Sequence, residues 1–503
     1  MFWRNRFVVL LGTTVMAAMM TAQQSGTVGI FEGSGDVGTV EHAGTAAFDA
    51  GRETYTLTGS GDNMWFGKDE FQFVWKKMSG RVSIAADISF PAEGKNEHRK
   101  AVLMVRQSLD SDAVYADAAL HGDGLTSLQF REAKGAETHE VRTVLKAPKR
   151  LKLVKRGNYF TMWVAGEDGR FVLASASPKI ELTEPFYVGI GVCSHEKDLL
   201  EKAEFSNVEV QASPTAVAKE IAPQLYSLME TIDVESGDRT AIYVAEGKFE
   251  APNWMPDGKR LLFNRDGKIE TIAATGGPTT QTIDTGSVVH CNNDHGISPD
   301  GKELVVSDQS RNAEHKSQIY ILPILGGPAR EVTRNAPSYW HGWSPDGKTL
   351  AFVGERGGEF DIYTIAVTGG EEKRLTTAKG LDDGPEYTPD GKYIYFNSER
   401  TGHMQIWRMK ADGSEQGQVT FGEENDWFPH FSPDGQQMVF ITFEPGVQGH
   451  PPNKDVELRM MTMANKKIHV VARLFGGQGT MNVPSWSPDG KQFAFVSYAV
   501  VAE

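Results

Sequence analysis

Two histidines stand at the same distance from a turn that this chain repeats. His295 and His341 each lie four residues before the proline of a Pro-Asp-Gly sequence, where the other four copies of the turn have proline. Asp383 and Glu386 lie ahead of the fourth copy, and His430 lies ahead of the fifth. Imidazole and carboxylate groups together suit a divalent transition metal, whereas carboxylates alone suit calcium. The pattern therefore indicates a polar site assembled from several repeats.

His295 and His341 are the candidate metal ligands of this site, with manganese or calcium as the candidate ion. Two other interpretations stay open. The side chains could line a water-filled channel, with buried histidines bonded to the backbone, or they could bind a ligand without a metal. No residue is assigned as a general base, so the catalytic residues stay unknown.

Aromatic residues accompany these polar groups. Tyr339 and Trp340 precede the third turn, and Trp427 and Phe428 precede the fifth. Aromatic rings beside polar groups suit the apolar face of a sugar, and packing between repeats is the alternative. The predicted ligand-binding residues are Tyr339, Trp340, Asp383, Glu386, Trp427 and His430.

The repeated turn dictates the elements that position these residues. Proline pre-sets the backbone of a tight turn, aspartate can bond to its own backbone, and glycine accepts a positive φ. An alternating apolar strand follows each copy. The six prolines are 43, 46, 44, 44 and 55 residues apart, at Pro256, Pro299, Pro345, Pro389, Pro433 and Pro488. Repeats of this length with four short strands each are typical of β-propeller blades.

Six turns predict a six-bladed β-propeller over residues 225–503. Residues 225–244 form two predicted strands that complete the last blade by pairing with the C-terminal strand. The turns join the innermost strand of each blade to the second strand, so they mark one face. The candidate residues, with Asp294 and a long connection at residues 444–455 that contains His450, belong to the opposite face at the mouth of the central channel.

Residues 27–211 are a run of short alternating segments with glycine, aspartate and asparagine between them. This pattern favours an antiparallel β-sandwich, so the whole chain is predicted to be all-β. A connector at residues 212–224, interrupted by Ser213, Pro214 and Pro223, is the predicted linker.

Residues 1–22 have the layout of a signal peptide. Arg4 and Arg6 precede an apolar run over residues 7–20, and small and polar residues follow. The mature protein is therefore expected to be periplasmic or secreted, without membrane insertion after the signal is removed. An uncleaved N-terminal anchor is the alternative.

Charge and cysteine content exclude several functions. The net charge is −15 and no long basic run occurs, which argues against nucleic acid or an anionic membrane as partner. Cys193 and Cys291 form neither a metal-type spacing nor a disulfide framework. The oligomeric state stays unknown.

The repeats resemble the TolB-like β-propeller family, whose blades carry the same turn followed later by an Asp-Ile-Tyr element, here Asp361-Ile362-Tyr363. Residues 59–65, 69–74 and 102–106 resemble the concanavalin-like jelly-roll modules of secreted carbohydrate-active proteins, which implies a sugar-binding or accessory role. The histidines ahead of the turns also resemble those of oligogalacturonate lyases. That resemblance implies manganese on His295 and His341, where the metal would neutralise a uronate carboxylate.

The leading hypothesis is an exported binding protein that recognises a carbohydrate or a cell-envelope protein through the propeller rim and the β-sandwich. The alternative is a metal-dependent carbohydrate-active enzyme, a lyase or a hydrolase, with its site at the channel mouth. A third interpretation is a scaffold of a Tol-type envelope complex. Whether the protein is an enzyme is left open.

Overall fold

The computed structural model describes residues 26–213, 223–311 and 314–501. The predicted signal peptide, residues 1–22, lies outside these ranges, as does most of the predicted linker at 212–224. The described residues form strands, turns and loops and no helix, so the all-β prediction is confirmed for them. It follows that no helix in these ranges could cross a membrane.

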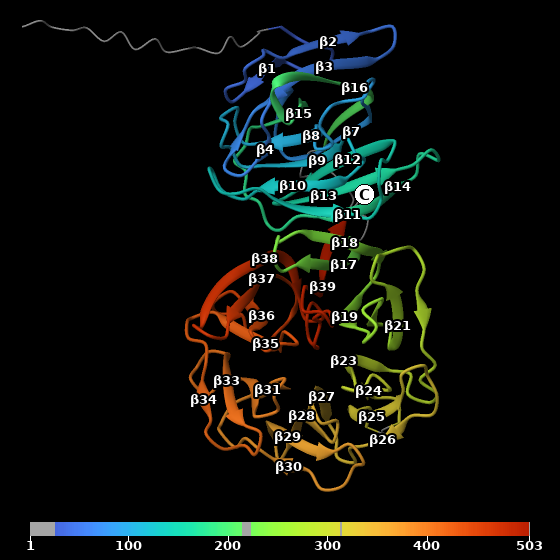
Figure 1. Ribbon diagram of the computed structural model, residues 1–503, viewed down its shortest axis with the longest axis vertical. Helices are drawn as coiled ribbons and strands as arrows, with labels where there is room; N and C mark the ends of the chain where they lie inside the picture. Colours follow the sequence, from blue (N-terminus) through green and yellow to red (C-terminus); the bar gives the residue numbers. More distant parts are fainter. Residues whose placement is uncertain (1–25, 214–222, 312–313, 502–503) are drawn as a thin grey trace, which may run out of the picture.

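The N-terminal part consists of two antiparallel sheets that pack face to face (Figure 1). In spatial order, the seven-stranded sheet contains β14 (Phe171–Ala176), β13 (Tyr159–Ala165), β12 (Arg150–Arg156), β7 (Arg81–Ser89), β16 (Glu196–Ser213), β3 (Thr54–Gly61) and β2 (Thr45–Asp49). The ten-stranded sheet contains β1 (Gly33–Val37), β6 (Phe71–Met78), β15 (Phe186–Cys193), β8 (Lys100–Arg106), β9 (Tyr115–His121), β10 (Thr126–Arg131), β11 (His139–Thr143), β18 (Arg239–Glu246), β17 (Gln224–Asp233) and β39 (Gln492–Val501). A small hairpin, β4 (Met64–Trp65) and β5 (Lys68–Asp69), stands apart from both.

Alternation explains why these segments form two layers. In β12, Leu151 and Leu153 are fully buried, while Lys152 between them is partly exposed. Such side chains meet Leu103 and Leu128 from the ten-stranded sheet in one shared core. Two packed sheets are what the sequence pattern favours; the finer assignment to a concanavalin-like jelly roll stays a prediction.

Five separate four-stranded sheets surround a common centre (Figure 1). The first three are β19 (Phe249–Trp254), β20 (Arg260–Arg265), β21 (Lys268–Ala273) and β22 (Gln281–Thr282); β23 (Cys291–Ile297), β24 (Glu303–Asp308), β25 (Gln318–Pro323) and β26 (Arg330–Glu331); and β27 (Ser338–Trp343), β28 (Thr349–Arg356), β29 (Glu359–Ala366) and β30 (Lys373–Arg374). The other two are β31 (Asp382–Tyr387), β32 (Tyr393–Ser398), β33 (Gln405–Lys410) and β34 (Gly417–Gln418); and β35 (Asn425–Phe431), β36 (Gln437–Phe443), β37 (Pro452–Thr462) and β38 (Lys467–Gly477). A β-propeller is therefore confirmed.

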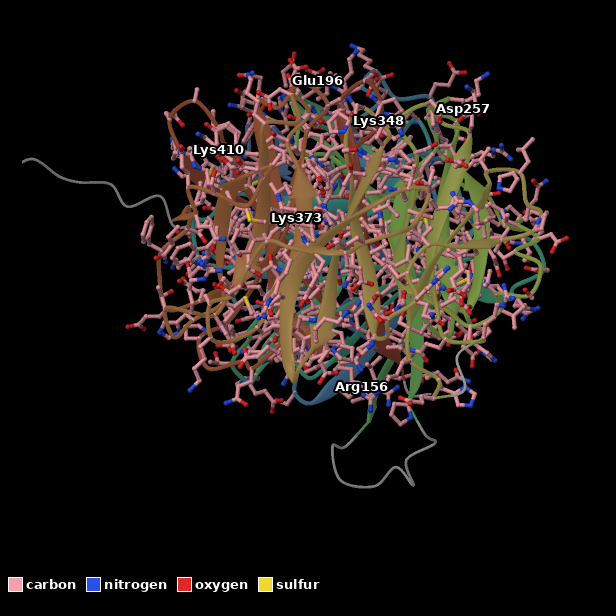
Figure 2. All side chains as sticks on the ribbon, turned by 90° about the horizontal axis from the view of Figure 1, so that it is seen from below. Arg156, Glu196, Asp257, Lys348, Lys373 and Lys410 are labelled. Atoms are coloured by element: carbon pink, nitrogen blue, oxygen red, sulfur yellow. The ribbon has the colours of Figure 1, made fainter. Side chains whose placement is uncertain are left out.

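The repeated turn has the geometry that its residues predict. In the second blade the Ser298 hydroxyl lies 2.7 Å from Asp300 Oδ1 and accepts a hydrogen bond of 2.9 Å from the Glu303 amide. Gly301 has a φ of 72°, which favours glycine. Asp257 and Lys348, from the first and third turns, lie toward the same side of the molecule (Figure 2). The turns thus share one face, as expected.

The prediction of six blades is wrong, because five blades form independent sheets. Strand β17 does pair with β39, as expected, from Gln224 opposite Val501 to Asp233 opposite Gln492. However, these strands and β18 belong to the ten-stranded sheet, where β18 pairs in parallel with β11. They occupy the place between the first and fifth blades (Figure 1). Residues 478–486, which precede the sixth turn, form no regular strand: they make an isolated bridge, Trp486 to Phe493, and scattered backbone hydrogen bonds, such as those that Ser485 and Thr480 accept from Ala494 and Val496.

The physical reason lies in two local features. Gly477 and Gly479 have positive φ, at 111° and 94°, where the chain leaves β38, and this turn delays the entry of the segment that would be innermost. At the other edge, β18 is eight residues long and offers free backbone groups to β11, whereas most blades end in a two-residue outer strand. A spacing of turns does not reveal either feature.

Candidate functional site

Four side chains from different elements meet near the inner strands of the ring. His341 of β27 places its Nε2 atom 3.2 Å from Oδ1 of Asp383 in β31. His450, from the connection between β36 and β37, places its Nε2 atom 3.7 Å from Oδ2 of the same carboxylate. Oδ1 of Asp294, in β23, lies 4.0 Å from the same Nε2 atom of His341. We call His341, Asp383, His450 and Asp294 the channel cluster.

Irregular inner strands position these residues. Each of β19, β23, β27, β31 and β35 shifts register against its partner strand at the site, for example between Asp383 and Glu386 and between Trp427 and His430. Ala251, Gly384 and Phe428 have positive φ there, at 56°, 59° and 54°. A β-bulge of this kind re-aims the neighbouring side chains. Each of these three residues directly precedes a proline, and that proline lies four residues before the proline of the turn.

Burial and mutual contacts set the protonation of the channel cluster. Burial, together with the nearby carboxylates of Asp383 and Glu250, raises the pKa of Asp294 to about 7, although His341 opposes the shift. Burial alone would lower the pKa of His341, but Asp294 and Asp383 raise it above its usual value. Burial tends to raise the pKa of Asp383, yet the imidazole of His341 brings the net shift below the usual value. The charged pair His341 and Asp383 is thus the stable form near neutral pH.

Glu386 and His430 form a second pair on the inner strands. The Glu386 carboxylate lies 2.5 Å from His430 Nδ1 and accepts a hydrogen bond of 2.9 Å from the Phe431 amide. His430 Nε2 lies 3.4 Å from the Met481 carbonyl oxygen. Both side chains are therefore committed to protein partners, which gives them a structural role in addition to any contact with a ligand.

His295 is isolated from the channel cluster. Its side chain is fully buried, and its polar neighbours are backbone groups of Ala251 and Asn292, although neither ring nitrogen makes a hydrogen bond of standard geometry with a described residue. Burial lowers its pKa to about 4, so the ring is neutral at physiological pH. Within the ranges that the structure describes, no three His, Cys, Asp or Glu side chains are arranged to hold a metal ion. Metal binding by His295 and His341 stays a prediction.

The aromatic candidates divide into two groups. Trp340 and Trp427 are only 2% and 1% exposed, and Trp340 lies against Gly296 of the neighbouring blade. Phe428 stacks on His341, with ring centroids 5.7 Å apart, and meets His450 edge-on at 5.1 Å. Tyr339 is half-buried, and burial together with Asp294 and Asp383 raises its pKa. Trp427 also meets His450 edge-on, with ring centroids 4.5 Å apart, so Trp427, Phe428 and Tyr339 border the channel cluster, whereas Trp340 packs between blades.

The structure brings together part of the predicted set. His341 and Asp383 meet, and Glu386 and His430 meet, as their equivalent positions ahead of the turns suggested. Neither Asp294 nor His450 was among the predicted ligand-binding residues. Asp294 directly precedes His295, and His450 lies in the insertion that lengthens the last interval between turns, so the sequence contained a hint of each residue. Neither hint indicates which carboxylate an imidazole contacts.

Comparison with known proteins places these observations in context. The family described as the TolB beta propeller domain matches residues 336–456. An uncharacterized protein of Agrobacterium fabrum (strain C58) is 47% identical over 272 residues, which is 54% of this chain and 92% of that protein.

Two solved structures resemble the chain. The structure of putative TolB from Agrobacterium tumefaciens is 47% identical, with a TM-score of 0.53, over 55% of this chain and 99% of that one. TolB from Acinetobacter baumannii is 17% identical, with a TM-score of 0.40, over 66% of this chain and 77% of that one.

Proposed function

This chain belongs to the TolB-like β-propeller family, and from that premise we propose that it is an exported binding protein of the periplasm or the extracellular space. Its ligand is a carbohydrate or a cell-envelope protein. The ligand contacts the propeller face opposite the Pro-Asp-Gly turns, and the N-terminal sheets contribute to recognition.

The observation that carries this proposal is the channel cluster. Asp383 holds two imidazoles that come from separate elements, and Nδ1 of both His341 and His450 makes no hydrogen bond of standard geometry with a described residue, although the Asn482 backbone lies near His341 and the Gln478 side chain near His450. Buried polar atoms normally have partners, so unsatisfied ones gathered at one place favour a ligand that supplies them. Phe428 and Tyr339 add aromatic surface beside them. Polar groups with aromatic neighbours are typical of binding sites for polar organic ligands.

The metal-dependent enzyme gains no comparable support. His295, one of its two predicted ligands, does not contact the channel cluster, and the described residues contain no preformed group of three metal-ligating side chains. The metal-dependent enzyme therefore stays the second hypothesis.

Retention on immobilised ligands tests the proposal. The purified full chain is passed over a panel of immobilised polysaccharides and, separately, over immobilised envelope extract. Retention without product release is expected on at least one of them. Asp383→Asn should reduce that retention, because the two imidazoles lose the charge that positions them. Failure of the unaltered chain to bind any of these materials would remove the proposal.

The matched control is Glu371→Gln. Glu371 is an exposed carboxylate between β29 and β30, on the side of the Pro-Asp-Gly turns. Its substitution should leave retention unchanged. Equal loss in both variants would indicate a nonspecific charge effect.

A further inference from the structure

A cavity opens at one end of the N-terminal sandwich, and we call it the sandwich cavity. Its volume is about 600 Å³, which lies in the range of sites for small organic ligands. Strands β7 and β13 of the seven-stranded sheet and β9 of the ten-stranded sheet reach it near their ends, and the connections that follow β11 and β13 border it. The lining residues are Ile88, Leu120, Leu145, Lys146, Ala147, Pro148, Lys149, Val164, Ala165, Gly166, Glu167, Asp168, Arg170 and Val172. No residue of the channel cluster lines it.

The buried part of this lining is the edge of the hydrophobic core. Ile88, Leu120 and Val164 are 8%, 6% and 3% exposed, and all three belong to the core that the two sheets share. They come from three different strands, so the core itself borders the cavity at this end. An alkyl chain packed against them would remove apolar area from water.

Exposed apolar side chains flank the opening. Leu145 lies in the connection between β11 and β12, and Val172 lies on the edge strand β14; each is 44% exposed. Both line the cavity although they belong to separate elements. Apolar groups that stay in contact with water around a cavity are typical of a surface that a ligand covers.

The charged groups at the rim favour an anion. Lys149 pairs with Glu167 at 2.9 Å, and Asp168 accepts a hydrogen bond of 3.1 Å from the Arg170 amide. Lys146 and Arg170 are exposed, and neither side chain forms an ion pair with a carboxylate of the described residues. Both carboxylates of the lining are thus engaged, whereas two cationic side chains are free. An anionic head at this exposed rim would keep much of its hydration, so the cost of burying a charge does not arise.

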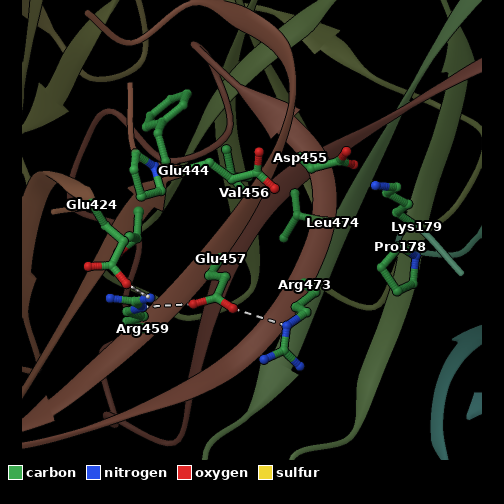
Figure 3. A pocket seen from close by; sticks show the side chains of 13 residues that line it. Pro178, Lys179, Glu424, Glu444, Asp455, Val456, Glu457, Arg459, Arg473 and Leu474 are labelled. Atoms are coloured by element: carbon green, nitrogen blue, oxygen red, sulfur yellow. Dashed lines mark hydrogen bonds and ion pairs between the residues drawn. The ribbon is translucent and has the colours of Figure 1, made fainter. Parts of the chain in front are cut away.

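The cavity between the N-terminal sheets and the fifth blade provides a contrast (Figure 3). It has a volume of about 320 Å³, and residues of β37 and β38 line it. Glu457 accepts hydrogen bonds from Arg459 at 2.8 Å and from Arg473 at 3.0 Å, as the dashed lines in Figure 3 show. Lys179 pairs with Glu181 at 3.0 Å. Every cation of its described lining therefore has an acidic partner, unlike Lys146 and Arg170 in the sandwich cavity.

The composition of the sandwich cavity indicates an alkyl chain instead of a sugar. Among its lining residues, all of which the structure describes, none is aromatic and none is a serine, threonine, asparagine or glutamine. A sugar needs stacking surfaces and hydrogen-bonding groups. A flexible apolar chain needs neither, and its affinity comes from the apolar area that it buries.

We propose that the sandwich cavity is a second binding site, which takes a free amphiphile with one straight alkyl chain and an anionic head. The chain lies against Ile88, Leu120 and Val164, and the head lies at the rim beside Lys146 and Arg170. The proposal does not depend on the channel cluster, so it stands or falls separately from the proposed function.

Titration calorimetry on the full chain tests this site. The probes are hexanoate, octanoate and decanoate, each below the concentration at which it forms micelles, and decyltrimethylammonium, which carries the chain of decanoate on a cation. We expect affinity to rise up to about fourfold for each added methylene, because each one buries further apolar surface. The cationic probe should bind about fivefold more weakly than decanoate, and added salt should weaken decanoate.

Vesicles of phosphatidylglycerol distinguish a free amphiphile from the chain of a membrane lipid. The protein is mixed with the vesicles, which are then sedimented, and it should remain in the supernatant. Cosedimentation that decanoate abolishes would assign the cavity to a membrane lipid and would overturn the proposal.

Two variants locate the binding. Lys146→Gln/Arg170→Gln removes both free charges, so it should weaken decanoate about fivefold and abolish the preference over the cationic probe. Val172→Asp places a carboxylate on the apolar rim and should weaken decanoate at least about tenfold. All three positions are exposed to solvent, so the melting temperature should change little.

The matched control is Lys68→Gln/Lys95→Gln. It removes two exposed positive charges from the N-terminal part, outside the cavity lining, and should leave decanoate binding unchanged. The proposal is overturned if decanoate does not bind, if its affinity does not exceed that of hexanoate, if the cationic probe binds as tightly, or if both variants keep full affinity.

Discussion

Asp294 and His295 are adjacent residues whose ionisation is shifted in opposite ways. The pKa of Asp294 rises from 3.8 to about 7, so the folded chain holds this proton more tightly than the unfolded chain. The pKa of His295 falls from 6.5 to about 4, so the folded chain holds that proton less tightly. Between about pH 4 and pH 6.5, the first shift lowers stability as the pH rises and the second raises it. The two effects oppose each other over this window.

Asp294→Asn should separate these effects. Asparagine removes the ionising group, so the variant avoids the cost of ionising a buried carboxyl as the pH rises. The variant should match the unaltered chain near pH 4 and exceed it at pH 8 by up to an amount on the order of 4 kcal/mol. Urea denaturation at several pH values measures the difference. If the difference in free energy of unfolding between the variant and the unaltered chain does not grow with pH, the assigned pKa shift is wrong. Glu371→Gln is the control, and its difference from the unaltered chain should not change with pH.

Asp383→Asn should have the opposite effect on stability. His341 has a raised pKa, so its contribution is full below about pH 6.5 and is lost as pH rises through its folded pKa. Asp383 has a lowered pKa, so its contribution is present above about pH 4 and is lost as pH falls. The substitution should therefore cost most between these limits, about 3 kcal/mol for a buried pair that loses one partner. Denaturation at pH 5 and pH 9 checks it; an equal cost at both would rule out the charged pair.

The sequence predicts individual residues of the site better than their contacts. His341, Asp383, Glu386 and His430 are found because the segments ahead of the turns can be compared within one chain. Which of them contact each other is not found, because register shifts in the inner strands change the direction of neighbouring side chains. His450 escapes comparison because the other blades have no equivalent of its long connection.

At the scale of elements, a close contact between blades explains why Trp340, a predicted ligand residue, is buried. Trp340 fills the space beside Gly296, where an added Cβ would lie 2.0 Å from its ring. Tryptophan on one inner strand thus requires glycine on the next. The sequence shows both residues but not that they face each other, and so Trp340 was assigned to ligand binding.

Gly296→Ala should therefore destabilise the ring. The methyl group cannot fit unless Trp340 moves, and Trp340 is enclosed by the apolar cluster between two blades. Overpacking of this severity should cost about 3 kcal/mol, read from the midpoint of urea denaturation. Gly417→Ala is the control because nothing lies within 4 Å of its added Cβ. If Gly296→Ala/Trp340→Leu does not regain stability, the contact is not the cause.

The turns and the strands after them are the elements that sequence predicts well. Proline, aspartate and glycine fix the backbone locally, so neighbours far away in sequence cannot override them. The number of blades is set differently. It depends on whether the strand at the edge of the last sheet finds a partner outside the ring, and β18 finds β11. A count of turns contains no information on that pairing.

At the scale of the whole molecule, one sheet joins the two parts. The parallel pairing places Val141 opposite Arg239 and Thr143 opposite Ala241, and Arg142 forms an ion pair of 2.9 Å with Asp238 beside it. Tyr159 and Asp455 make a second link, and Arg473 and Glu132 a third. The solved relative from Agrobacterium tumefaciens matches over 99% of its length but 55% of this chain, so nearly half of this chain has no counterpart there.

These links predict cooperative unfolding. The two parts share backbone hydrogen bonds and a continuous sheet, so neither can unfold without exposing an edge of the other. Differential scanning calorimetry should show a single transition, with calorimetric and van't Hoff enthalpies that agree. Two well-separated transitions would show that the shared sheet does not couple the parts. Glu132→Gln, which breaks one surface ion pair, should leave a single transition.

The position of β39 also sets an order of events during synthesis of the chain. Its partner β17 is made before any of the five blades, and β39 is made after all of them. Until β39 appears, β17 presents an unpaired edge that could pair with another nascent chain. Joining strands so far apart in sequence is also slow, because a long loop must close before the pairing stabilises it. Incomplete chains that stop before β39 would thus be unable to close the ring. The unpaired edge of β17 would leave them open to aggregation or proteolysis.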